Sequence, residues 1–454
     1  MDKNRSKFSG KIGFVLSAAG SAVGLGNIWR FPYLAAKYGG GIFLLVYLVL
    51  VLTFGYAMIM AETALGRMTQ KSPVSAFQRF GNRVWMKIGG WINAIVPILI
   101  VPYYSVIGGW VCKYLFEYIR GSEMTLAQDG YFGGFISNGG SVEFWFLVFT
   151  FVTLAIIYMG VENGIERVSR LMMPVLVVLA VVIAVYSVTR PGAIEGVKYF
   201  LIPDFSRFSL MTVVSAMGQM FYSLSIAMGI LVTFGSYMKK DVHIEEATTN
   251  VEFFDTIIAV LAGLMIIPAV FAFSNGDAST LNAGPSLMFI TLPKVFSSMG
   301  LGTIAGILFF LLVLFAALTS SIALSESAVS TFEDELGWSR KKSTILMAVI
   351  MVGLGTLSSL GYGPLSFITI IGMPFLDFFD FLTNSIMMPI AAFLTCMLVV
   401  YVIGLDKMKQ EISLDGAVFK REKIFNFMMR YLCPFFVIVI LISSVLNVLG
   451  IISM

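Results

Sequence analysis

The sequence predicts an all-α integral membrane protein with about 11 transmembrane helices, built as a five-plus-five inverted repeat with broken helices 1 and 6. Three observations predict this fold. The 454 residues are 58% hydrophobic and only 12% charged. Apolar stretches of about 20 residues, the length that crosses a bilayer, recur along the whole chain. Two of these stretches contain residues that interrupt a helix.

Each expected helix is an apolar segment that ends at polar or charged residues. The segments are residues 11–36, 41–66, 86–119, 143–160, 165–188, 209–238, 251–274, 300–333, 343–361, 370–403 and 429–452. We expect residues 1–454 to form a single membrane domain, with a first repeat at about 11–188, a second at about 209–403 and an extra helix at about 429–452.

The basic residues predict the orientation of these helices, because cytoplasmic loops carry an excess of lysine and arginine. A cytoplasmic N-terminus places the basic clusters at 67–87, 239–240, 340–342 and 407–430 inside. We therefore expect a multi-pass protein of the cell membrane with a cytoplasmic N-terminus and an external C-terminus. The net charge of +4 then reflects topology and indicates no nucleic-acid partner. The chain has no phosphate-binding loop and no nucleophile motif, which predicts that it is not an enzyme and that an ion gradient drives it.

Two runs of residues interrupt the helical pattern. The first, Ser21 to Pro32, contains glycines, Asn27 and Arg30; the second is Ser223 to Gly229. A glycine costs about 1 kcal/mol in a helix relative to alanine, and irregular backbone persists in a bilayer only beside a polar cavity. The runs therefore predict a site for a transported solute. They lie five segments apart, and an odd offset turns the second half of the chain upside down relative to the first.

Several motifs follow one another in the order of a known family. They are Gly20 to Pro32, Gly66-Arg67, Tyr103-Tyr104, Gly218-Gln219, Phe289 to Pro293, Leu318 to Ser321 and Glu333 to Leu336. With these motifs the sequence resembles the neurotransmitter:sodium symporter family, closest to its bacterial, eleven-helix amino-acid transporters. The resemblance implies a sodium-coupled symporter that imports neutral hydrophobic or aromatic amino acids by alternating access. The expected partners are the amino-acid substrate and the lipid bilayer, and the oligomeric state stays open.

The resemblance also implies two sodium ions. The ligands of the first would be Ala22, Asn27, Ser223 and Asp255. The ligands of the second would be Gly20, Val23, Ala316, Thr319 and Ser320. Many relatives carry asparagine where this chain has Asp255. We infer that a carboxylate at this position supplies a fixed negative charge and removes the need for chloride.

The implied substrate site is uncharged. Relatives that carry amines without a carboxyl group have an aspartate at the position of Gly24, so a glycine implies that the substrate brings its own carboxylate. The implied substrate-binding residues are Ser21, Ala22, Leu25, Gly26, Ile100, Tyr104, Tyr222, Ser223, Ser225, Met228, Ser320 and Leu324. Helix packing is an alternative role for the aliphatic members of this set, Ile100 and Leu324 above all.

Charged residues on either side of this level predict two gates. Arg30 and Asp380 would form the outer gate, with Asp377 as the alternative partner. The inner gate would consist of Arg5, Asp334, Ser236 and Tyr237. In the fifth helix, Gly164 and Pro174 match a spacing that in the family allows the cytoplasmic end of the helix to unwind.

Two alternatives remain open at this stage. A proton-coupled transporter would use Asp255, Glu62 or Glu326 as the titrating group instead of binding sodium. A channel or a receptor with the same fold is the other. A channel needs a continuous polar pore, whereas the polar residues here gather at one level with charges above and below.

Overall fold

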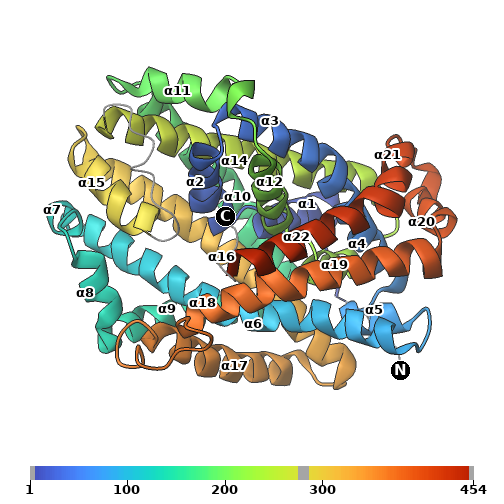
Figure 1. Ribbon diagram of the computed structural model, residues 1–454. Coiled ribbons are helices and arrows are strands. Elements are labelled where there is room, and N and C mark those ends of the chain that lie inside the picture. Colours follow the sequence, from blue (N-terminus) through green and yellow to red (C-terminus); the bar gives the residue numbers. More distant parts are fainter. Residues whose placement is uncertain (1–5, 275–285, 449–454) are drawn as a thin grey trace.

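The computed structural model describes residues 6–274 and 286–448, and this part of the chain is helical, with no β-strand (Figure 1). Nine of the described helices are long and apolar enough to cross a membrane, and a bent pair adds a tenth. The nine are Gly41–Thr69, Val84–Ile119 (α6), Gly139–Tyr158 (α9), Val161–Val188, Ile244–Ser274 (α14), Gly302–Glu335 (α16), Arg340–Leu360 (α17), Phe375–Ile403 and Glu422–Asn447.

Four of these spans change helical pitch along their length. The span that begins at Gly41 consists of α3 (Gly41–Leu50), η2 (Val51–Gly55) and α4 (Tyr56–Thr69), and the one that begins at Val161 consists of η3 (Val161–Glu166) and α10 (Arg167–Val188). The span that begins at Phe375 consists of α18 (Phe375–Asp380), η7 (Phe381–Met387), α19 (Met388–Met397) and η8 (Leu398–Ile403). The last consists of α21 (Glu422–Phe427), η10 (Met428–Leu432) and α22 (Cys433–Val448). Short helices outside the spans are α5 (Pro73–Gln78), α7 (Glu123–Leu126), α8 (Tyr131–Ser137), α11 (Ala193–Leu201), α15 (Leu292–Ser297) and α20 (Leu405–Ile412).

The first and sixth predicted spans are the interrupted ones. The first consists of α1 (Lys11–Ala22), followed by η1 (Gly26–Arg30) and α2 (Phe31–Lys37), with a bend of 52°. The sixth consists of α12 (Leu210–Ser223) and α13 (Ile230–Ser236), which are separated by 224–229. In the described part of the chain, every predicted span therefore coincides with helix, and both breaks fall where the sequence predicted them.

The backbone explains why these two positions break. Val23, at the end of α1, has an extended conformation with ψ 90°. In the second break Ser225, Ala227 and Gly229 have φ values of 54°, 60° and 68°, a left-handed conformation that only glycine adopts without strain. The two breaks contact each other, since the hydroxyl of Ser225 donates to the carbonyl of Ser21 at 3.2 Å. Irregular backbone in both breaks is thus held at one level of the protein.

The interrupted helices lie in the interior. Nine of the twelve residues of α1 are buried, as are all seven residues of α13. In contrast, only seven of the 21 residues of α17 are buried, and α17 lies at the lower edge of the view in Figure 1. The peripheral helices therefore surround the broken ones, and this arrangement places the breaks away from lipid.

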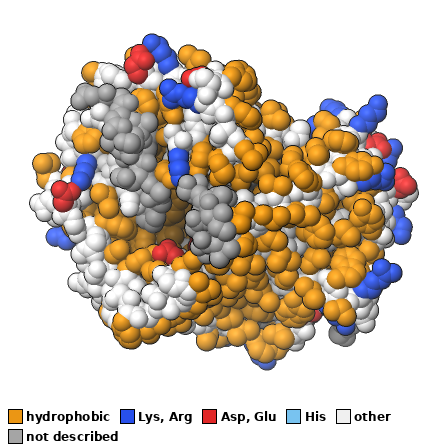
Figure 2. All heavy atoms as spheres, in the orientation of Figure 1, with side chains coloured by type: hydrophobic (Ala, Val, Ile, Leu, Met, Phe, Trp, Pro, Cys, Tyr) orange, Lys and Arg blue, Asp and Glu red, His pale blue; other side chains and the backbone are white. Residues whose placement is uncertain are grey.

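The outer surface is strongly apolar. On the face shown in Figure 2, hydrophobic side chains form a broad continuous area, and most charged side chains gather at two opposite ends of the molecule. Large apolar side chains such as Val49, Tyr401 and Phe435 are more than half exposed. Such an area is typical of a protein that lipid surrounds.

Candidate functional site

A cluster of polar side chains gathers around Asp255 of α14, which is fully buried. The side chain of Asn27 donates to one carboxylate oxygen at 2.8 Å, and the hydroxyl of Ser223 donates to the same oxygen at 2.7 Å. The hydroxyl of Tyr47, from α3, donates to the other oxygen at 2.9 Å. The structure therefore brings together three of the four predicted ligands of the first sodium ion, and Ala22 lies beside them in the lining of the adjacent cavity.

Tyr47 is the member of this cluster that the sequence did not predict. Its side chain is fully buried, and its hydroxyl also lies 3.4 Å from that of Ser223. The sequence signal was weak, because a single tyrosine in an apolar span predicts no particular partner.

The cluster is rich in oxygen atoms that could bind a hard cation. It offers oxygens from a carboxylate, an amide and two hydroxyls, and hard cations prefer oxygen ligands. No group of three or more His, Cys, Asp or Glu side chains that could hold a metal ion occurs among the described residues. The one carboxylate and the neutral oxygens around it are compatible with sodium, the ion that the sequence predicts at this place.

The residues predicted for the second sodium ion lie where α1 meets α16. The hydroxyl of Thr319 donates to the carbonyls of Phe315 at 3.0 Å and Ala316 at 3.2 Å. The hydroxyl of Ser320 lies 3.3 Å from the carbonyl of Gly20. The helices are so close that a Cβ on Gly20 would lie 3.1 Å from the Cβ of Thr319.

Val23, the fifth member of this set, is buried at the adjoining end of α1. The structure therefore brings Gly20, Ala316, Thr319 and Ser320 together where α1 meets α16, and Val23 follows at the end of α1.

A small cavity lies between these two regions, bounded by α1, α6, α12 and α16. It brings together all twelve residues predicted for the substrate site, and Gly24, Asn27 and Ile230 complete its lining. No lining residue carries a charge. The cavity therefore excludes a charged side chain unless that charge is met by an ion or by backbone.

One end of this cavity is polar and crowded. The backbone N–H of Leu25 donates to the hydroxyl of Tyr104 at 3.2 Å. A Cβ on Gly24 would lie 2.7 Å from the Ser320 hydroxyl oxygen and 3.0 Å from that of Tyr104. The backbone can approach these hydroxyls only because position 24 is a glycine, and an aspartate there would fill the polar end.

A second cavity lies on the other side of a thin partition. Leu25, Tyr104 and Tyr222 line both cavities and so separate them. The second cavity is also lined by the predicted outer-gate residues Arg30 and Asp380.

The predicted outer-gate salt bridge is not formed in this structure. The guanidinium of Arg30 lies 5.5 Å from the centre of the Tyr222 ring, and Asp380 accepts hydrogen bonds from Tyr103 at 3.1 Å and Asn384 at 2.5 Å. Within the described ranges no salt bridge joins Arg30 to a carboxylate.

The alternative partner, Asp377, accepts a hydrogen bond from Tyr362 at 2.9 Å. Both carboxylates are therefore held by neutral donors, and the Arg30 side chain lies above the partition over the Tyr222 ring.

The predicted inner-gate residues lie at the opposite end of the broken helices. Arg5 lies outside the described residues. Asp334 accepts from the backbone N–H of Ser72 at 2.7 Å. The hydroxyl of Ser236 donates to the carbonyl of Thr233 at 2.6 Å.

Tyr237 belongs to a buried network. Its hydroxyl donates to Glu326 at 2.7 Å, and the guanidinium of Arg340 donates to both oxygens of the same carboxylate at 2.5 and 3.1 Å. Glu62, like Glu326 an alternative titrating group in the sequence analysis, accepts the backbone N–H of Ala227 at 2.8 Å. Glu326 thus forms an ion pair across helices, and Glu62 braces the second break.

The fifth helix is irregular at the predicted place. Gly164 lies within η3, where the N–H groups of Gly164 and Ile165 both point to the carbonyl of Gly160 at 3.1 Å. Pro174 lies inside α10. The carbonyl of Gly160 thus accepts two hydrogen bonds where the helical pitch changes. Unwinding this end of the helix would therefore break fewer regular helical hydrogen bonds.

Comparison with known proteins defines the class to which this fold and site belong. The sequence matches the Sodium:neurotransmitter symporter family over residues 5–129 and 132–451. The chain belongs to this family. It is therefore a multi-pass membrane transporter that depends on sodium, and it is not an enzyme.

Individual relatives agree with this membership. An uncharacterized sodium-dependent transporter, YhdH, of Bacillus subtilis is 35% identical, with 98% of each chain covered. One from Methanocaldococcus jannaschii is 30% identical, with 90% of this chain and 84% of the relative covered. The crystal structure of MhsT in complex with L-phenylalanine matches with a TM-score of 0.87 and 37% identity, covering 97% of this chain and 100% of MhsT. The predicted all-α transporter fold is confirmed.

Proposed function

We propose that this protein is a sodium-coupled symporter that imports neutral hydrophobic or aromatic amino acids by alternating access. The carrying observation is an uncharged cavity that lies directly beside the Asp255 cluster and whose polar end accommodates the hydroxyls of Ser320 and Tyr104 only because position 24 is a glycine. Family membership supports sodium dependence, and the complex of MhsT with L-phenylalanine supports an amino-acid substrate.

The polar end of the cavity would hold the substrate carboxylate. The N–H of Leu25 donates to the hydroxyl of Tyr104, so the two groups lie together at this end of the cavity, where each would donate to a substrate carboxylate. Their charge-assisted hydrogen bonds to a carboxylate would be stronger than the neutral bond that they make now. The first sodium ion, held by Ala22, Asn27, Ser223 and Asp255, would be the carboxylate's counter-ion. This direct contact couples the two solutes, because each lowers the free energy of binding the other by the same amount.

The rest of the cavity sets the substrate class. The carbonyls around Ala22, Tyr222 and Ser225 would accept the amino group. Apolar side chains then surround the substrate side chain, and Met228 among them adapts to ligands of different shape because its chain is flexible.

We assign the second sodium ion to the contact of α1 with α16, at Gly20, Val23, Ala316, Thr319 and Ser320. Asp255 supplies a fixed negative charge beside the first ion, so chloride is not required. The first ion neutralises the charges of Asp255 and of the substrate carboxylate, which are costly to bury unpaired.

A conformational change would expose this site to the two sides of the membrane in turn. We assign Arg30 and Asp380 to the outer gate, and Asp334, Ser236 and Tyr237 to the inner one with Arg5. The separation of Arg30 from Asp380 and the cavity above Tyr222 fit an outer gate that has not closed. Unwinding at Gly164 and Pro174 would give water access from inside. The two halves, 11–188 and 209–403, would act as inverted repeats, with the N-terminus in the cytoplasm.

Uptake into proteoliposomes tests this function. Radiolabelled leucine, phenylalanine, tyrosine, lysine and glutamate would be offered under an inward sodium gradient, then with potassium in place of sodium, each with chloride or gluconate. We expect accumulation of the neutral substrates only, driven by sodium with or without chloride. Uptake that follows a pH gradient in the absence of sodium would instead support the proton-coupled alternative through Asp255 or Glu62.

A further inference from the structure

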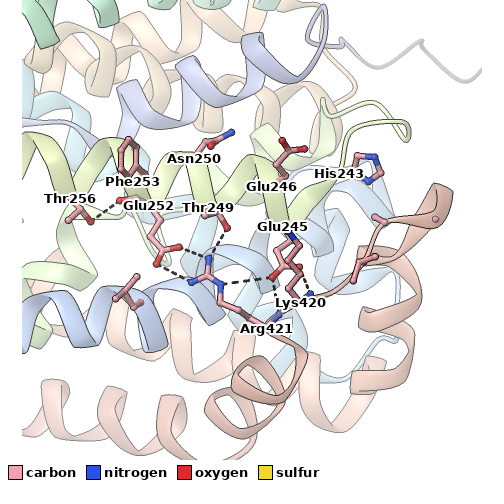
Figure 3. Close-up of a pocket in the computed structure, with 14 residues that line it drawn as sticks. His243, Glu245, Glu246, Thr249, Asn250, Glu252, Phe253, Thr256, Lys420 and Arg421 are labelled. Atoms are coloured by element: carbon pink, nitrogen blue, oxygen red, sulfur yellow. Dashed lines mark hydrogen bonds and ion pairs between the residues drawn. The ribbon is translucent and has the colours of Figure 1, made fainter.

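The segment between α19 and α22 packs against α4 and the first turns of α14. A cavity lies between this segment and α14, and Figure 3 shows the side chains that line it. Arg421 extends from the segment into this cavity and lies among Glu245, Thr249 and Glu252 of α14. The cavity therefore contains a contact between a loop that is distant in sequence and the helix that carries Asp255.

The guanidinium of Arg421 binds α14 with its planar fork. It donates to both oxygens of Glu252 at 3.3 and 3.0 Å, and to the hydroxyl of Thr249 at 2.7 Å. The central carbon of the guanidinium lies 3.6 Å from the centre of the Tyr56 ring of α4. Only 4% of the Glu252 side chain is exposed, against 23% of the Arg421 side chain, so the carboxylate of the pair is largely shielded from water. A shielded, two-pronged ion pair of this kind fixes both distance and orientation.

Glu245 forms a second anchor for the same segment. Its carboxylate accepts the backbone N–H groups of Lys420 at 2.7 Å and Arg421 at 3.0 Å, and it also accepts the hydroxyl of Tyr56 at 2.9 Å. Glu245 and Glu252 are two helical turns apart on one side of α14. Two anchors so spaced hold the helix against sliding and against rotation.

The anchored turns adjoin the proposed ion site. Asp255 follows Glu252 by three residues, which is about 4.5 Å along a continuous helix. The donors that surround the Asp255 carboxylate come from other helices, namely α3, α12 and η1. The geometry of the cluster therefore depends on where α14 lies relative to those helices.

The segment has an independent attachment. Arg67 of α4, which is 1% exposed, donates to the side chain of Glu411 on α20 at 2.6 Å and to the carbonyl of Val242 at 2.7 Å. These contacts do not involve Arg421. Replacing Arg421 therefore leaves the segment tied to the protein and changes mainly the restraint on α14.

From these contacts we propose that Arg421 is a positioning residue for the first sodium site, acting through Glu252 and Thr249 on the helix that carries Asp255. The inference rests on the proposed function, because it takes Asp255 to be a sodium ligand. The segment between α19 and α22 then has a role in sodium affinity, although none of its residues lines the proposed substrate cavity.

Sodium-dependent binding of radiolabelled phenylalanine to the full-length protein tests this role. The variants are Arg421→Gln, Arg421→Lys, Glu252→Gln and the double variant Arg421→Gln/Glu252→Gln. Lys423→Ala, at an exposed position two residues away, is the matched control. Each protein is titrated with sodium at constant ionic strength, and its melting temperature is measured in the same detergent.

We expect Arg421→Gln to raise the sodium concentration for half-maximal binding about fivefold or more, while maximal binding is retained. Arg421→Lys keeps the charge but loses the fork, so its shift is smaller. The double variant leaves no unpaired buried charge, so its increase in the half-maximal sodium concentration should be smaller than the product of the increases in the two single variants. A lower melting temperature with an unchanged sodium titration would overturn the proposal, because the clamp would then only stabilise the fold. If Asp255→Asn also leaves the sodium titration unchanged, the assignment of the ion site fails instead.

Discussion

At the scale of single residues, the site depends on which atoms approach Asp255 and Gly24. Asp255 is a buried carboxylate with donors on both oxygens, and Gly24 is a position where even a methyl group meets two hydroxyls. Asp255 supplies negative charge, and Gly24 leaves space for the groups around it. Both properties are needed if a sodium ion and a substrate carboxylate are to lie in contact.

Asp255→Asn should weaken sodium binding and make it sensitive to chloride. The amide keeps the shape of the carboxylate but removes the negative charge beside the ion. We expect the half-maximal sodium concentration to rise about tenfold, or about 1.4 kcal/mol, in chloride-free buffer. Chloride should recover part of this loss, since the hydroxyl that faces the new amide nitrogen loses its acceptor and is free to donate to an anion. Sodium titrations of substrate binding in chloride and in gluconate measure both effects.

Gly24→Ala should impair amino-acid binding strongly. The added Cβ lies 2.7 Å from the Ser320 hydroxyl oxygen, so Ser320 or the backbone must move. We expect the affinity for phenylalanine to fall about tenfold or more. Gly218→Ala is the control, because a Cβ there has no neighbour within 4 Å. Equal affinities of the two variants in an equilibrium binding assay would contradict the proposed position of the substrate carboxylate.

At the scale of elements, the unwound stretch between α12 and α13 is held by its surroundings. Gly229 has φ 68°, and a Cβ on it would lie 2.6 Å from the carbonyl oxygen of Asn93. Ser225 and Ala227 adopt similar φ values despite their side chains, and the carboxylate of Glu62 accepts the N–H of Ala227. The break is therefore a specified structure and not a loose hinge.

Gly229→Ala should destabilise the protein, because both the backbone conformation and the packing exclude a side chain. We expect a loss of about 1–3 kcal/mol, seen as a lower melting temperature. Gly353→Ala is the matched control, since that glycine lies in α17 with open space around its Cα. A melting temperature of Gly229→Ala equal to that of Gly353→Ala would show that the second break tolerates other conformations.

At the scale of the whole molecule, the sequence pattern predicted the spans and both breaks, and the family resemblance named twelve residues that line one cavity. Apolar length and helix-breaking residues report directly on burial and backbone. Contacts between helices were harder to predict from the sequence. Tyr47 gave no signal of its partner, and Arg421 was counted only among charges that set orientation. The separation of Arg30 from Asp380 was not predicted, since a gate as proposed would form this contact in one state and break it in another.

The reciprocity of sodium and substrate binding is the property that most directly tests the proposed coupling. Isothermal titration of the purified protein with phenylalanine at several sodium concentrations, and with sodium at several phenylalanine concentrations, measures both affinities. We expect saturating sodium to raise the affinity for phenylalanine by the same factor by which saturating phenylalanine raises the affinity for sodium. Phenylalanine affinity that is independent of sodium but changes with pH would contradict a direct contact between the substrate carboxylate and a bound sodium ion.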